Sequence, residues 1–217
     1  MNQPADPSRI LPARDRILNA AEVVFSEDGF SGAAMKAISQ RAEVAQGLLH
    51  YHFASKDGLY AAVIARRSGR INAERIARLE KVDLAAPDAV ERIMDALLRP
   101  PLGPAGGGRA YGRIFAGLLV GGERDRAMVT EHYDPTARRF IEALSRACPG
   151  ASAQVVAWGY SFAIGALVAT VARDDRPGRL VGAGTGALDI DAIVARLVSF
   201  ASGGIRAAIA AERGSTT

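Results

Sequence analysis

Apolar residues recur at intervals of three and four along almost the whole chain, which is the period of an amphipathic helix. No stretch shows the alternation of apolar and polar residues that is typical of a half-buried strand. The pattern therefore predicts an all-α protein whose helices cover 12–28, 34–42, 46–52, 88–99, 109–124, 133–148, 151–173 and 189–212. A further, longer helix is expected to begin at Ser55, to carry Leu59, Val63, Ile64 and Ile71, and to end before a break at 83–87. Two segments rich in Pro and Gly or otherwise without helical pattern, 100–108 and 174–188, are expected to be exposed loops.

The front of the chain predicts a helix-turn-helix arrangement, because two short helices follow a longer one and only three residues join them. The residues expected to face inward are Met35, Ile38, Ala42, Val44, Leu49 and Phe53. The face pointing away from this core carries Gln46, Gly47, Leu48, His50 and Tyr51. The major groove of DNA can receive such a face, since Gln can make two hydrogen bonds with adenine and Leu can contact the methyl group of thymine. A helical hairpin with an ordinary polar exterior is the alternative at this point.

The distribution of charge is compatible with a nucleic-acid partner at the front of the chain. Residues 1–82 hold 12 Lys and Arg against 9 Asp and Glu, whereas residues 83–217 hold 15 against 14. All three lysines, Lys36, Lys56 and Lys81, lie in the first segment. The excess is small, and a solvated helical face would have a similar composition.

The stretch from Arg16 to Val63 resembles the TetR family of bacterial transcriptional regulators, and its most specific part is LLHYHF-x-SK-x-x-L. The resemblance implies an N-terminal DNA-binding domain over 1–58, a connecting helix over 59–82 and a larger helical domain over 83–217. It also implies a double-stranded DNA operator, a small-molecule effector bound by the larger domain, and a homodimer built mainly on the last two helices. A ligand-responsive regulator, acting as a repressor without enzymatic activity or cofactor, is the function that this resemblance predicts.

Carried over position by position, the resemblance implies a set of residues that contact DNA: Lys36, Gln46, Gly47, Leu48, His50, Tyr51 and Lys56. Lys56 would meet backbone phosphate together with the N-terminal amides of its helix. Four positions depart from the commonest family pattern. Ala34 replaces a phosphate-binding Thr, Glu43 a turn Gly, Ala45 a capping Ser, and His50 a Tyr. We expect Glu43 to adopt a left-handed conformation and the missing cap to weaken the following helix.

The rest of the chain is less specific, and two sets of residues stand out there. An apolar effector pocket is predicted from Tyr111, Phe115, Met128, Phe140, Trp158 and Phe162, although ordinary core packing would use the same residues. Arg113 or His132 are candidate anchors for an acidic or polar ligand, with surface exposure as the alternative. A dimer interface is predicted from Ala157, Ser161, Gly165, Ala169, Ile193, Leu197 and Phe200, because small residues at every fourth position allow close approach of helices.

Other classes of protein fit the sequence less well. Residues 151–172 are uncharged and long enough to span a bilayer, but their polar and small residues favour a buried helix, so no membrane partner is expected. Gly159–Ala163 nearly matches a nucleophile elbow and Gly182–Ala187 a dinucleotide-binding loop, but neither follows a predicted strand. His50 and His52 lack a third metal ligand nearby. The lone Cys148 and the absence of an apolar signal segment predict a cytoplasmic protein, and a helical interaction protein without DNA binding is the competing function.

Overall fold

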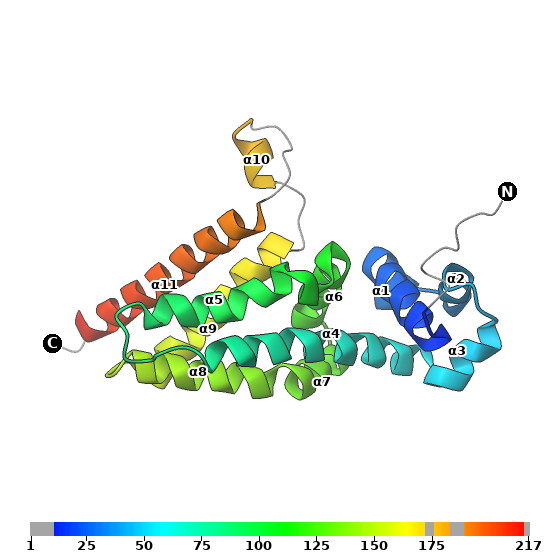
Figure 1. The fold of residues 1–217 in the computed structure, drawn as a ribbon, viewed down its shortest axis with the longest axis horizontal. Helices are drawn as coiled ribbons and strands as arrows, with labels where there is room; N and C mark the ends of the chain where they lie inside the picture. Colours follow the sequence, from blue (N-terminus) through cyan, green and yellow to red (C-terminus); the bar gives the residue numbers. More distant parts are fainter. Residues whose placement is uncertain (1–10, 172–175, 183–188, 215–217) are drawn as a thin grey trace. The chain divides into compact units, whose positions relative to one another are not determined.

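The computed structural model describes residues 11–171, 176–182 and 189–214, and these residues form an all-helical fold, as the sequence predicts (Figure 1). The described chain divides into two compact units, Met1–Arg67 and Ser68–Thr217. The elements are α1 (Ala13–Gly32), α2 (Met35–Arg41), α3 (Gln46–Phe53), α4 (Lys56–Leu79), α5 (Ala89–Leu102), a 3₁₀ turn (Pro104–Gly106), α6 (Gly108–Val120), α7 (Glu123–His132), α8 (Asp134–Ala147), α9 (Ala153–Val171), α10 (Arg176–Leu180) and α11 (Ile190–Gly214). The predicted domain boundaries at 58 and 82 stay predictions.

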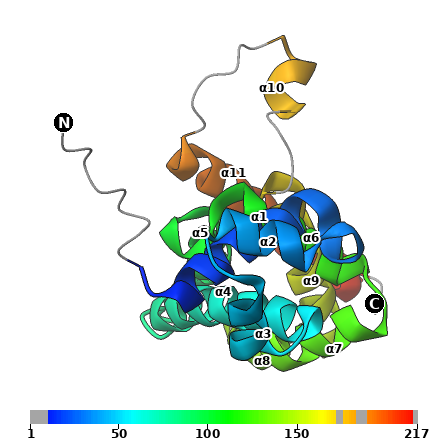
Figure 2. The same ribbon diagram turned by 90° about the vertical axis from the view of Figure 1, so that its right-hand side faces the viewer.

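The first unit packs α1, α2, α3 and the start of α4 around one small core, which Figure 2 views from the side of α2 and α3. Ile17, Leu18 and Phe25 of α1, Ile38 of α2 and Leu49 of α3 are all buried, and α2 contacts both α1 and α3. The helix α1 bends where Gly29 has φ +67°, a conformation that glycine adopts at low cost. Of the positions that the sequence predicts to face inward, Ile38, Ala42, Leu49 and Phe53 are buried, whereas Met35 and Val44 are half-buried.

In the second unit, α5 is the central helix, because it contacts α8, α9 and α11. Eight of the 14 residues of α5 are buried, and Ile93, Met94, Leu97 and Leu98 among them are fully enclosed. Phe140 is also fully buried, on α8, which contacts α5. The helix α11 packs along both α5 and α9, so residues almost a hundred positions apart in the sequence form the same layer (Figure 1).

The structure differs from the expected elements in three places. The helix expected over 109–124 ends at Val120, and α7 begins after Gly121 and Gly122, where a side chain at Gly121 would collide with Asp125. The segment 100–108 is not an exposed loop, because α5 continues through Pro100 and Pro101 and the 3₁₀ turn follows it, with Pro100 and Gly106 buried. The short helix α10 lies within the expected loop 174–188, of which 174–175 and 183–188 are outside the described residues.

Candidate DNA-binding surface and internal cavity

The helix α3 presents one face to the core and the other to solvent. Leu49 and Phe53 are buried, whereas Gln46, Gly47, His50 and Tyr51 are exposed and Leu48 is half-buried. Tyr51 is 83% exposed although its ring contacts that of His52, and large exposed aromatic residues mark interaction surfaces. On the preceding helix Lys36 is also exposed. The predicted recognition residues thus lie on one open surface of the first unit, while their contact with DNA stays a prediction.

Glu43 and Ala45, two of the positions that differ from the commonest family pattern, lie in the turn between α2 and α3. Glu43 has φ +51°, so a side-chain-bearing residue occupies the left-handed conformation expected there. Ala34 and Ala45 occupy the N-cap positions of α2 and α3, and neither helix has a side-chain cap hydrogen bond. The first N–H groups of α3 therefore remain for solvent or for another acceptor, such as a phosphate oxygen.

The junction between α3 and α4 is tight and locally constrained. Ala54 has φ +57°, and the N–H of Ser55 donates to the carbonyl oxygen of Phe53 at 2.6 Å, which closes a γ-turn. Ser55 then caps α4, because its Oγ accepts the N–H of Gly58 at 3.0 Å. The Lys56 ammonium lies 4.8 Å from the centre of the Phe30 ring and donates to the carbonyl oxygen of Ser31 at 3.1 Å. Lys56 is thus held beside the start of α4.

A buried carboxylate fastens α1 to α4 within the first unit. Glu22 is 4% exposed and accepts hydrogen bonds from Arg66 at 3.1 Å and from Arg67 at 2.7 Å and 2.9 Å. Arg66 also donates to the side-chain oxygen of Asn19 at 2.9 Å. Charge-assisted bonds of this kind are stronger than neutral ones and fix geometry as well. These bonds hold the first part of α4 against α1.

The second unit contains a small cavity lined by α4, α5, the 3₁₀ turn, α6, α9 and the residue before α8. It encloses about 20 Å³, which is room for a single water molecule. Most of its wall is apolar and comes from Ile71, Pro101, Phe115, Leu167 and Val171. Its polar groups come from Arg75, Tyr111 and Tyr133, and the hydroxyl groups of the two tyrosines are hydrogen-bonded to each other.

Arg75 is the charged residue of this cavity, and it is 2% exposed. Its Nε donates to the carbonyl oxygen of Leu97 at 2.9 Å, and its Nη1 donates to the side-chain oxygen of Asn72 at 3.4 Å. Among the described residues no carboxylate pairs with it. Burial lowers the pKa of Arg75, and the nearby Tyr160, Tyr133 and Tyr111 act in the opposite direction. The cavity therefore holds a cation whose charge no acidic side chain in the described chain balances.

The predicted effector-pocket residues separate into three groups. Tyr111 and Phe115 line the cavity. Phe140 is fully buried in the core beside α5, and Met128 is half-buried on α7, so neither lines it. Trp158 and Phe162 are 56% and 66% exposed and lie on the surface of α9 instead. The pocket prediction used only the apolar character of these residues. The direction in which each side chain points depends on how its helix packs.

Arg75 and Tyr133 line the cavity although the sequence did not predict them as pocket residues. The two candidate anchors, Arg113 and His132, are not among the residues that line it. Arg113 is exposed, and His132 is half-buried with its carbonyl oxygen accepting a hydrogen bond from Asn72. A signal for Arg75 does exist in the sequence. Ile71, Arg75 and Leu79 are spaced four apart on α4, so the arginine lies in the middle of an apolar stripe.

The predicted dimer residues also divide between the surface and the interior. Ser161, Gly165, Ala169 and Phe200 are exposed, and Phe200 is 70% exposed. Ala157 and Ile193 are half-buried. Leu197 is buried within the chain on α11, which contacts α5 and α9, so it does not lie on the open surface. The dimer interface as a whole stays a prediction.

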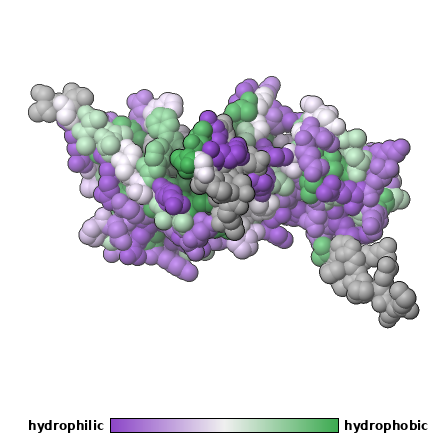
Figure 3. All heavy atoms as spheres, turned by 90° about the horizontal axis from the view of Figure 1, so that it is seen from above, coloured by the Kyte–Doolittle hydropathy of each residue, from purple (hydrophilic) through white to green (hydrophobic). Residues whose placement is uncertain are grey.

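The exposed aromatic residues of α9 form a small cluster. The rings of Trp158 and Phe162 stack with their centroids 5.4 Å apart. In the view from above, hydrophobic surface lies among hydrophilic side chains in the second unit (Figure 3). Two described helices, α9 and α11, are long and apolar enough to cross a membrane, by length and composition only.

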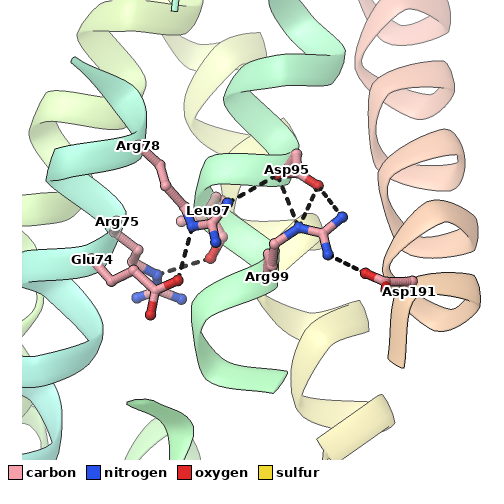
Figure 4. A network of polar contacts seen from close by, with 7 residues as sticks. All are labelled: Glu74, Arg75, Arg78, Asp95, Leu97, Arg99 and Asp191. Atoms are coloured by element: carbon pink, nitrogen blue, oxygen red, sulfur yellow. Dashed lines mark hydrogen bonds and ion pairs between the residues drawn. The ribbon is translucent and has the colours of Figure 1, made fainter. Parts of the chain in front are cut away.

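A chain of ion pairs runs over α4, α5 and α11 in the second unit (Figure 4). Arg78 donates to Glu74 at 2.9 Å and lies 3.7 Å from Asp95, which also accepts from Arg99 at 2.9 Å. Arg99 in turn reaches Asp191 at the start of α11. The hydrogen bonds with Asp95 and Asp191 raise the pKa of Arg99. Because these groups are partly solvent-exposed, the network fixes orientation more than it adds stability.

The motifs of other classes find no supporting geometry in the described residues. Gly159–Ala163 lies inside α9 rather than at a strand-to-helix turn. Most of the glycine-rich segment 182–187 is outside the described residues. No group of three potential metal ligands occurs in the part of the chain that the structure describes.

Two family models match the chain. The model for bacterial regulatory proteins of the tetR family matches residues 17–63, and the model for the tetracyclin repressor-like C-terminal domain matches residues 91–204. The second match alone covers more than half of the 217 residues. The chain belongs to the TetR family of transcription regulators.

Individual relatives agree with this assignment. The regulator UidR of Escherichia coli is 48% identical over 59 residues, which are 27% of this chain and 30% of UidR. The repressor KstR of Mycolicibacterium smegmatis is 31% identical over 119 residues, or 52% of this chain and 55% of KstR. The chain thus aligns with less than two thirds of the length of these curated relatives.

Solved structures share the fold over almost the whole chain. A TetR-like transcriptional regulator from Rhodococcus sp. RHA1 is 25% identical, with a TM-score of 0.64 over 90% of this chain and 98% of that one. The fatty acid degradation regulator FadR of Bacillus halodurans is 16% identical, with a TM-score of 0.66 over 88% of this chain and 98% of that one. At 16% identity the second likeness shows the fold alone.

Proposed function

We propose that this protein is a ligand-responsive transcription regulator that binds a palindromic operator as a homodimer and represses transcription until a small molecule releases it. The observation that carries the proposal is the open face of α3, where Gln46, Gly47, His50 and Tyr51 are exposed together above a buried Leu49. Gln46 supplies the paired donor and acceptor that can read adenine, and Gly47 lets the backbone approach the groove. Membership in the TetR family and the printed names of UidR and KstR support the same function.

Phosphate contacts would hold this face in place. Lys36 is exposed on α2, and Lys56 stands beside the capped N-terminus of α4. Uncapped amides at the start of α3 add further donors for phosphate oxygens. Such contacts position a protein on DNA and make its affinity depend on salt, whereas base contacts provide specificity.

The dimer would form through the exposed faces of α9 and α11. Trp158, Phe162 and Phe200 are each more than half exposed, and large exposed aromatic residues mark interaction surfaces. Gly165 has no heavy atom within 4 Å of an added Cβ, so its surface is open for a second helix. This contact would also explain why only 28% of the apolar window in α9 is buried within one subunit.

Membrane association is the competing explanation for the apolar surface of these helices. We favour burial of this surface in the dimer of a cytoplasmic regulator. Sedimentation of the full-length protein in buffer without detergent separates the two. We expect a dimer for the wild type and a monomer for Gly165→Leu, whereas Gly117→Leu on the exposed side of α6, where an added Cβ is equally unobstructed, should remain a dimer. A monomeric wild type, or extraction that requires detergent, would contradict the proposal.

DNA binding is tested by selecting bound fragments from the genome that encodes this chain, followed by gel-shift assays. We expect an enriched palindrome whose half-sites are about 34 to 36 Å apart, or a near multiple, because a symmetric dimer places its two recognition helices on one face of the duplex. A selection that yields no enriched palindrome would contradict the proposed function.

A further inference from the structure

The cavity of the second unit combines a buried cation with an apolar wall, and this combination indicates the chemistry of its ligand. Arg75 is fully enclosed by protein, yet no described carboxylate neutralises it. Bringing an unbalanced charge out of water is costly, so buried charges are normally paired. A buried charge that lacks its counter-ion and lines a cavity is therefore a candidate for binding an anion from outside.

The hydrogen bonds of Arg75 leave part of its guanidinium for a ligand. Within the described residues, its bonds to Leu97 and Asn72 use two of the five N–H groups that a guanidinium has. Both partners are neutral oxygen atoms. An arriving carboxylate would supply the missing charge and match the planar fork of N–H groups.

The remaining wall limits what can be attached to that anion. Ile71, Phe115, Leu167 and Val171 are apolar, and the hydroxyl groups of Tyr111 and Tyr133 are the other polar groups of the wall. One cation balances one negative charge, so a singly charged carboxylate fits better than a phosphate dianion. An apolar body fits this wall because burying it costs no unpaired polar groups.

We propose that this cavity binds a small monocarboxylic acid, with its carboxylate on Arg75 and its apolar body against Ile71, Phe115 and Leu167. The inference rests on the proposed function, because it assigns a chemical class to the effector of that regulator. In the described structure the cavity holds about 20 Å³, so the ligand has to separate its walls on entry. One close approach in this wall is between α6 and the end of α9, where an added Cβ at Gly112 would lie 3.0 Å from Val171.

The test uses calorimetric titration of the full-length protein with straight-chain carboxylates from butanoate to decanoate, each compared with its primary amide. The acid and its amide have nearly the same shape but differ in charge. We expect at least one acid in the series to bind about tenfold or more tightly than its amide. Equal affinities of every acid and amide, or no binding by any acid, would overturn the proposal.

Variants then locate the site. Arg75→Gln should weaken the preferred acid at least tenfold while changing the affinity for its amide by less than about twofold. Because Arg75→Gln also loses a bond to Leu97 and can fail to fold, Tyr133→Phe provides a second variant that keeps the ring and removes only the hydroxyl group. It should weaken the acid about threefold, and Glu142→Gln on the exposed side of α8 should leave it unchanged.

Acid affinity that stays unchanged in both Arg75→Gln and Tyr133→Phe would place the acid elsewhere and overturn the proposal. These titrations contain no DNA. If no acid binds, the result of the operator selection is not affected. If the protein does not bind DNA, the measured affinities for the acids are not affected. The two proposals can therefore be contradicted separately.

Discussion

The Nε of Arg75 donates to the carbonyl oxygen of Leu97 at 2.9 Å, and this bond replaces one that the helix α5 cannot make for itself (Figure 4). In a regular helix, the carbonyl of Leu97 would accept the N–H of the residue four positions later. That residue is Pro101, which has no N–H. The guanidinium from α4 therefore satisfies a buried carbonyl that a proline has left without its partner.

This relationship predicts a coupling between Arg75 and Pro101 in stability. Arg75→Met should destabilise the second unit by about 1 to 3 kcal/mol, because the Leu97 carbonyl becomes an unsatisfied buried acceptor. In the background of Pro101→Ala, which restores the N–H, we expect about 1 kcal/mol of that loss to be recovered. Urea unfolding of the wild type, the two single variants and the double variant measures the coupling. Strict additivity of the two substitutions would show that the proline is not the reason for the bond.

Glu22 should be the most sensitive acidic residue of the first unit. Glu22→Ala removes a buried carboxylate from the half-buried Arg66 and Arg67, so the unit should lose about 3 kcal/mol. The matched control is Glu27→Ala, since Glu27 and Arg41 are 3.7 Å apart and both more than half exposed, and it should cost less than about 0.5 kcal/mol. Thermal unfolding followed by circular dichroism distinguishes them, and equal losses would contradict the ranking.

Ala45→Ser should stabilise the first unit by about 1 kcal/mol, because it gives α3 the cap that it lacks. The backbone at Ala45 has φ −65° and ψ 140°, which is the extended conformation that a capping serine uses. Ala65→Ser on the exposed part of α4 should instead cost about 0.5 kcal/mol, since a serine within a helix has no cap to form. Denaturant midpoints that move in the same direction for both variants would argue against capping as the cause.

The pair of Glu91 and Arg206 predicts a dependence of stability on pH. The hydrogen bond from Arg206 at 2.6 Å lowers the pKa of Glu91, so folding favours its ionised form. This contribution is present above the unfolded pKa of glutamate, about 4.3, and is lost as the pH falls through the lower folded pKa. Since the pair is partly exposed, Glu91→Gln should cost about 0.2 to 1 kcal/mol at pH 7.

The difference between wild type and Glu91→Gln should disappear in acid, where Glu91 is protonated in both the folded and the unfolded state. Unfolding measured across pH 3 to 7 provides the profile. Glu142→Gln on the exposed side of α8 serves as the control and should follow the wild type. A Glu91→Gln deficit that persists unchanged below pH 4 would assign the effect to packing rather than to charge.

Contacts to bases and to phosphates should respond differently in the DNA complex. Gln46→Ala should change the base preference at one position of each half-site, at a cost of about 1 to 3 kcal/mol on the preferred sequence. Lys56→Ala should weaken all sequences alike and reduce the dependence of affinity on salt. Fluorescence anisotropy on the operator and on substituted operators measures both. If the two variants weaken every sequence equally, the assignment of reading and anchoring roles is wrong.

Much of the first unit could be predicted because its information is local. The spacing of Ile38, Leu49 and Phe53 decides which sides of α2 and α3 are buried, and that decision leaves the face of Gln46 and Tyr51 outside. The left-handed Glu43 could also be predicted, because the resemblance to the TetR family places it where a turn Gly is usual. The γ-turn at Ala54 had no comparable sequence signal, because alanine has no preference for positive φ.

The second unit shows where such predictions fail. Trp158 and Phe162 look like pocket residues in the sequence, yet they lie on the surface, because almost every side of α9 is apolar and the pattern does not say which side meets α11. Leu197 looks like a residue of an open dimer surface in the sequence, yet it lies on the buried stripe of α11. Hydrophobic periodicity defines a face only where polar residues mark the other one.

The sequence by itself determined an all-helical chain, the helix-turn-helix and the family to which the protein is similar, since all three depend on the order and spacing of neighbouring residues. Only the tertiary structure decided that Arg75 lies at a cavity with Tyr111 and Tyr133, and that it bonds the carbonyl of Leu97. Those residues come from separate helices, α4, α5, α6 and the start of α8. Their approach results from the packing of helices in space, which a one-dimensional pattern does not record.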